Sequence, residues 1–129
     1  MSILDDIGTH LTSEGVVGGA TGWTLRKGIS TATPDQIVVV SETGGFGVDQ
    51  YSNPPVGDPS FQILVRAASR RYDLARTQIG LAFTALNQGT VSGYLFIHAL
   101  SAGPLSLGFD ANDRPLLTWN FRARKEALS

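Results

Sequence analysis

The acidic segment FDANDRP, Phe109–Pro115, has the residue types most suggestive of chemistry. Its aspartates, Asp110 and Asp113, could hold a cation or act as an acid pair. A calcium loop of the EF-hand type needs glycine at its sixth position and glutamate at its twelfth. Counted from Asp110, these positions hold Pro115 and Phe121, so the spacing excludes such a loop.

An acid pair needs a dry pocket that raises the pKa of one carboxyl group. A polar turn between strands is wet, and Asp and Asn side chains readily bond to their own backbone there. Pro115 can begin a strand at a position where its missing N–H is not needed. The segment therefore predicts a hairpin turn.

The glycine-rich stretch GGFG, Gly44–Gly47, is a weak match to a phosphate-binding loop. The dinucleotide fingerprint needs a further glycine that opens a helix, but Gln50 holds that place and Asn53-Pro54-Pro55 follows. The lysine of a P-loop is missing as well. We interpret the stretch as part of a loop and predict no cofactor.

The two histidines, His10 and His98, belong to different predicted elements. A catalytic triad or a histidine–metal site would have to use one of them. His98 lies in an apolar run, which favours a structural histidine, and no glycine-flanked serine marks a nucleophile. We predict no enzyme activity and no metal site.

Four arginines cluster in the sequence and could touch phosphates: Arg66, Arg70, Arg71 and Arg76. The net charge is −1, however, with 10 basic and 11 acidic residues. Without a positive field or interleaved aromatic residues, such a cluster favours a solvated face or pairing between subunits.

Composition favours one domain over residues 1–129. The chain has no cysteine, and its 16% charged residues fall below the ~25% of an ordinary domain, a hint that other subunits cover part of the surface. The N-terminus has no basic region typical of a secretory signal, and no apolar run is long enough to cross a membrane.

Periodicity predicts which elements carry these residues. Helices are expected at residues 2–13 and 69–89, with Ser69 as N-cap and Gly89 after the second helix. Strands are expected at residues 23–27, 36–42, 61–66, 91–100 and 115–124. A glycine-rich segment completes residues 1–22, and turn formers fill a long loop at residues 43–60. The predicted class is α+β: a mostly antiparallel twisted sheet of about five strands, one long helix packed on it, and a short N-terminal helix.

Taken in order, these segments over residues 34–124 resemble the bacteriophage minor capsid proteins of the tail terminator type. The shared features are an acidic strand end, a proline-containing loop, an arginine-bearing strand, an Arg-Tyr junction into a helix, and a Gly-x-Asp turn before a final strand. The matching residues are Glu42, Pro54, Pro55, Arg66, Arg71, Tyr72, Gly108, Asp110, Arg114, Asn120 and Phe121.

The resemblance implies a structural virion protein that assembles in the host cytoplasm. It implies a ring, a hexamer in this family, that caps the head-proximal end of the tail tube. The ring stops tube polymerisation and meets a neck or head-completion protein, while phage DNA passes through its lumen without specific binding. A ring needs two different complementary patches on each subunit.

We expect the long loop to supply subunit or partner contacts through Gly44, Gly45, Phe46, Gly47, Tyr51, Pro54 and Pro55. Two alternatives stay open from the sequence. The chain could be a head-completion or neck protein closer to the portal, or an α+β domain that binds or transforms a small molecule.

Overall fold

The computed structural model describes residues 3–18, 21–49, 56–87, 91 and 94–125. In these residues the elements follow in the order α1 (Ile3–Ser13), β1 (Thr24–Lys27), β2 (Ile37–Asp49), β3 (Val56–Arg66), α2 (Tyr72–Asn87), β4 (Tyr94–Ala99), β5 (Leu105–Phe109) and β6 (Pro115–Lys125). The predicted α+β class is confirmed, with a sheet of six strands instead of about five. No helix in the described part of the chain is long and apolar enough to cross a membrane.

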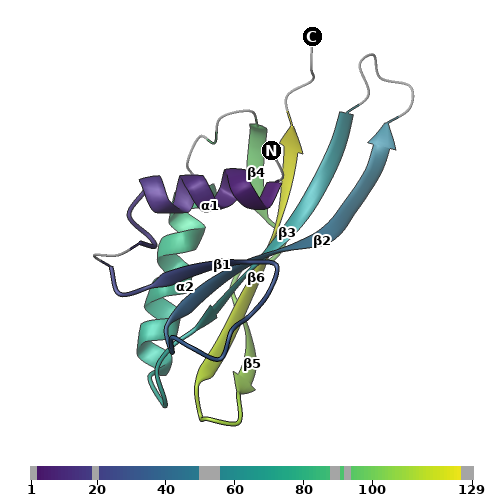
Figure 1. The fold of residues 1–129 in the computed structure, drawn as a ribbon. Coiled ribbons are helices and arrows are strands. Elements are labelled where there is room, and N and C mark those ends of the chain that lie inside the picture. Colours follow the sequence, from purple (N-terminus) through teal and green to yellow (C-terminus); the bar gives the residue numbers. More distant parts are fainter. Residues whose placement is uncertain (1–2, 19–20, 50–55, 88–90, 92–93, 126–129) are drawn as a thin grey trace.

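The six strands form one twisted sheet with β6 near its centre (Figure 1). The strand order is β1-β2-β3-β6-β4, and β5 pairs with β6 as well. Strand β4 pairs with the last part of β6, and β5 pairs with its beginning, so both lie on the same side of β6. The pair β1–β2 is parallel, and the other pairs are antiparallel.

Both helices pack on one face of the sheet, where their apolar stripes form the core. In α2 the buried residues Ala75, Ile79, Ala82 and Leu86 recur at helical spacing, as do Ile3, Ile7 and Leu11 in α1. They cover alternate residues of the strands, because successive side chains of a strand point to opposite faces. The strand residues in this core are Val38, Val40, Phe61, Ile63, Val65, Leu117, Trp119, Phe121 and Ala123.

Aromatic rings fill the centre of this core, as the alternation in β6 predicts for Trp119 and Phe121. The ring of Phe121 stacks on Phe61 with centroids 5.3 Å apart. Phe83 of α2 stacks on Trp119 at 4.3 Å. Each fully buried side chain of this size contributes about 1.5–3 kcal/mol. The Phe61–Phe121 pair therefore stabilises the sheet, and the contact of Phe83 with Trp119 positions α2 on it.

Polar contacts attach α1 to the rest of the domain. His10 Nε2 donates to the Ala85 carbonyl of α2 at 2.8 Å, and the Tyr94 hydroxyl donates to Asp6 Oδ2 at 2.8 Å. Burial and the Asp6 carboxylate both raise the pKa of Tyr94, so the hydroxyl keeps its proton. These distant partners place the N-terminal helix over the core.

The predicted loop at residues 43–60 is wrong for most of its length. Strand β2 continues to Asp49 and β3 begins at Val56, so both flanks pair as a hairpin arm that projects from the body (Figure 1). The arm register shifts twice, between Glu42 and Gly45 and between Phe46 and Asp49. Backbone pairing across the arm overrides the turn preference of glycine and proline, and bulges absorb their irregularity.

One smaller prediction also fails, and one strand was missed. Helix α2 begins at Tyr72, and the Arg71 carbonyl accepts its first bonds from Leu74 and Ala75, so Ser69 is not the N-cap. The backbone turns instead at Arg70, which has φ of 60° and donates its N–H to the Asp113 carbonyl. Strand β5 was not predicted. Gly89 lies outside the described residues.

Candidate assembly surfaces

The Asp110–Arg114 segment forms the predicted hairpin turn between β5 and β6. The Asp110 N–H donates to the Arg114 carbonyl at 3.0 Å. Asp110 Oδ1 accepts from the N–H groups of Asn112 and Arg114 at 2.9 and 3.0 Å, and Arg114 Nε donates to Asp110 Oδ2 at 2.8 Å. All the carboxylate oxygens of Asp110 are therefore used to hold the turn.

These contacts also decide the charge state of Asp110. Desolvation alone would raise the pKa of its carboxyl group, but the hydrogen bonds from Arg114 and Asn112 and the charge of Arg114 outweigh this effect. The pKa is lowered, which is opposite to what a general acid needs. The turn therefore has a structural role.

Two buried arginines extend from this end of the sheet and hold the connection between β1 and β2. Arg114, 6% exposed, donates from Nη1 to the Ala32 carbonyl at 2.7 Å and to Asp35 Oδ1 at 3.1 Å. Arg66, 4% exposed, donates to the carbonyls of Asp35 and Pro34 at 3.1 and 2.6 Å. The two guanidinium groups thus act as a clamp on residues 30–35.

Arg66 was predicted to belong to an arginine cluster that binds phosphates or pairs with another subunit. Its buried position in the clamp shows that this prediction is wrong for Arg66. Burial lowers the pKa of Arg66 and Arg114 lowers it further, while Asp110 and Asp35 raise it. An arginine keeps its charge even so, and here the charge is used inside the subunit. Arg70, Arg71 and Arg76 are exposed.

The predicted Arg-Tyr junction lies at the start of α2. Arg71 forms a double hydrogen bond with Asp73 at 3.0 and 2.9 Å. The hydrogen bond and charge of Asp73 raise the pKa of Arg71. Tyr72 is exposed, so this junction presents an aromatic ring and an ion pair to solvent.

The predicted Asn-Phe pair in β6 divides between the two faces of the sheet. Phe121 is fully buried in the aromatic core, and Asn120 is exposed, where its Oδ1 accepts from Gln62 Nε2 at 3.2 Å. Phe121 thus anchors β6 in the core, and Asn120 joins β6 to β3 through its bond with Gln62.

The histidines lie apart. His10 is used in the contact with α2, and His98 is exposed in β4 with its ring stacked on Phe96 at 5.0 Å. The prediction of a structural histidine in an apolar setting is therefore wrong for His98. Across the described residues, no group of three His, Asp or Glu side chains could hold a metal ion.

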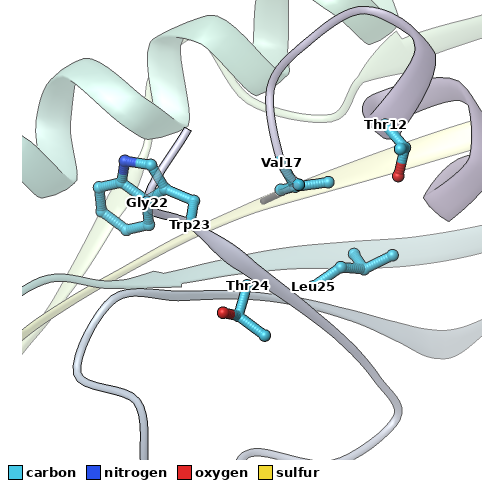
Figure 2. A pocket seen from close by; sticks show the side chains of 7 residues that line it. Thr12, Val17, Gly22, Trp23, Thr24 and Leu25 are labelled. Atoms are coloured by element: carbon cyan, nitrogen blue, oxygen red, sulfur yellow. The ribbon is translucent and has the colours of Figure 1, made fainter. Parts of the chain in front are cut away.

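A groove runs between α1 and β1 and consists of two adjoining pockets of about 260 and 350 Å³ that share Thr12 and Leu25. Figure 2 shows the smaller pocket, with Val17 and Trp23 on its wall. None of the residues lining this pocket titrates, and the Thr12 hydroxyl is already bonded to the Gly8 carbonyl. The smaller pocket thus offers shape and apolar surface, and the larger pocket includes Lys27, whose ammonium group pairs with Asp5 at 2.9 Å.

The expected contact loop divides between the arm and residues that are not described. Gly44, Gly45, Phe46 and Gly47 belong to β2. Tyr51, Pro54 and Pro55 lie outside the described residues. The part that the structure describes is thus a paired strand, which can offer its backbone edge to another molecule.

Strand β5 carries an exposed apolar surface that was missed from the sequence. Leu105, Leu107 and Phe109 are 61, 52 and 55% exposed. Gly108, with φ of 86°, supports a bulge that interrupts pairing with β6 between Ser106 and Gly108. The alternation LSLGF between Pro104 and Asp110 is the sequence signal that could have identified this strand.

Residues 10–127 match the model of a family described as bacteriophage tail terminator protein. No curated protein matches the sequence at a significant level. A chain in a solved structure of the virion of a native gene transfer agent (GTA) particle is similar, with a TM-score of 0.70 and 14% sequence identity over 98% of this chain and 96% of that chain. At this identity, the similarity shows a common fold.

Proposed function

Because the chain belongs to the bacteriophage tail terminator family, we propose that it forms a ring that caps the head-proximal end of the phage tail tube. It is a structural component of the phage tail. In the proposed role, the ring ends tube polymerisation and presents the surface on which the head is joined. The family match over residues 10–127 carries this proposal, since it includes nearly all of the described fold.

The structure supports self-assembly in two places. Strand β5 exposes three large apolar side chains, and in the arm β2 and β3 continue past the residues that pair with β1 and β6. A cyclic ring requires two different surfaces that complement each other. The proposal assigns these two roles to β5 and to the arm.

The proposed partners follow from the position of the ring. One face of it meets the tail tube protein and the other a neck or head-completion protein. Six copies surround a lumen through which DNA passes without sequence-specific contacts. Assembly takes place in the host cytoplasm, and the finished virion retains the ring at its neck. No catalytic step enters this role.

Negative-stain imaging of the purified chain, with and without tail tubes, tests this role. The proposal predicts one ring at a single end of each tube and a native mass that is a fixed multiple of the subunit mass. Rings on portal-containing heads with bare tube ends would favour a head-completion protein instead. A chain that stays monomeric and binds neither structure would overturn the ring.

A further inference from the structure

Strand β5 is an edge strand without the usual protection against strand addition. Its only strand partner among the described residues is β6, and all five of its residues are exposed. It contains no charged residue. Natural edge strands are generally protected by charges, proline, covering elements or bulges that twist the edge away. In β5 only the bulge is present, and the exposed surface is apolar.

At the edge strands β4 and β1, an outward backbone group is already bonded within the subunit. On β4 the Ala99 N–H points away from β6, because Leu100 donates to β6, and Asn87 Oδ1 accepts it at 3.2 Å. On β1 the Leu25 carbonyl points away from β2 and accepts from Arg26 Nη1 at 3.2 Å. Helix α1 also packs beside β1, where Gly8 lies against Leu25. These contacts occupy part of the β4 and β1 edges, whereas the apolar side chains of β5 are exposed.

The arm lacks a strand partner on one side. Strand β1 pairs with β2 only from Ile37 to Val40, and β6 pairs with β3 only from Ser60 onward. In the described chain, β2 from Ser41 to Asp49 therefore has β3 on one side and no strand on the other. A two-stranded hairpin alone is marginally stable in water, so a third strand would stabilise the arm.

Within one subunit these two features cannot meet. Strand β5 flanks the beginning of β6, at Pro115–Thr118, whereas the arm starts beyond Arg122, near the other end of β6. Figure 1 shows them at opposite ends of the molecule. The arm can reach a β5 strand only on another copy, and such a head-to-tail contact leaves each copy with one donor and one acceptor, as a closed ring requires.

We propose that the outer edge of β2, Ser41–Asp49, adds as a strand to β5 of a second copy of this chain. The apolar side chains of β5 become buried by this addition, and main-chain hydrogen bonds join the two sheets. The proposal rests on the ring proposed above and names the surfaces that close it.

Two variants that are designed to retain the fold test the pairing. Leu107→Asp removes the apolar acceptor, and replacement of residues 44–59 by a two-residue Asn-Gly turn between Thr43 and Ser60 removes the donor strand. Leu107 is 52% exposed, and Asn-Gly suits a tight hairpin. Leu81→Asp, at an exposed leucine of α2 with 51% exposure, is the matched control for adding a charge.

Native mass spectrometry with and without tail tubes gives the readout, and circular dichroism checks folding. The wild type and Leu81→Asp should form the same oligomer. Each test variant alone should be monomeric, with its affinity for self-association reduced at least tenfold. An equimolar mixture of the two variants should form a one-to-one dimer and no larger species. Full oligomer from Leu107→Asp, or a mixture that stays monomeric, overturns the pairing but leaves the ring intact. A monomeric wild type in all conditions overturns the ring as well.

Discussion

Arg114 and Asp110 close the β5–β6 turn through a bond of 2.8 Å between Nε and Oδ2, while Nη1 of the same guanidinium holds Asp35. One buried side chain therefore fixes both the direction of β6 and the connection that precedes β2. The residues of FDANDRP position strands, and one of these strands, β5, is the acceptor in the proposed contact.

Replacement of Arg114 by alanine should destabilise the subunit by about 2–4 kcal/mol. Breaking a fully buried pair costs about 3–5 kcal/mol, and the cost here is lower because Asp35 stays accessible to water. Urea unfolding at neutral pH would measure the change. The matched control is Arg71→Ala, whose ion pair with Asp73 is exposed, and it should leave the unfolding midpoint unchanged. Equal effects of the two variants would refute the clamp.

Acid should weaken the turn in a predictable direction. The pKa of Asp110 is lowered in the folded protein, so its carboxylate stabilises the fold above the unfolded pKa of about 4, and this contribution is lost as pH falls through the folded pKa. Asp110→Asn should therefore be less stable than the wild type at pH 7, with the difference shrinking below about pH 4. Denaturant titrations from pH 7 to pH 2 measure this, and a difference that stays constant would rule the effect out.

Substitution of two phenylalanines in neighbouring strands should distinguish an effect on folding from an effect on assembly. Phe121→Ala should cost about 3–5 kcal/mol, because it opens a cavity in the core where the ring stacks on Phe61. Phe109→Ala, at an exposed site, should change stability by no more than about 0.5 kcal/mol and weaken the oligomer. Thermal unfolding and native mass on both variants check this contrast. A stable oligomer in Phe109→Ala would count against β5 as a contact surface.

Phe46→Ala should impair assembly more than it affects the stability of the monomer. Phe46 belongs to the arm, opposite Asp58 and beyond the part of β3 that pairs with β6. The measurement compares the melting temperature with the fraction of subunits in the oligomer. A large loss of melting temperature with normal assembly would show that Phe46 serves the fold instead.

The core and the turn were predictable because their signals are local. The alternation of Leu117, Trp119 and Phe121 predicts the buried face of β6, and Asp110 with Arg114 predicts the turn. Helical spacing likewise predicts α1 and most of α2. In each case a few adjacent residues determine both the element and the face that it buries.

The arm and the role of β5 were not predictable, because they depend on residues that are distant in the sequence. Glycine and proline in residues 43–60 indicate a loop, yet pairing between β2 and β3 makes strands of its flanks. The sequence of β5 is short and bulged, and its role depends on an edge of β6 that only the tertiary fold defines. The buried position of Arg66 also depends on a distant segment, residues 30–35.

The length of tails in particles that lack this protein tests the central proposal most directly. Electron microscopy of a deletion phage, compared with the same phage complemented by the wild-type chain, gives the length distribution. A ring that ends polymerisation predicts overlong or headless tails that return to the normal length on complementation. Finished tails of normal length beside unstable heads would contradict the terminator role and identify a head-completion protein.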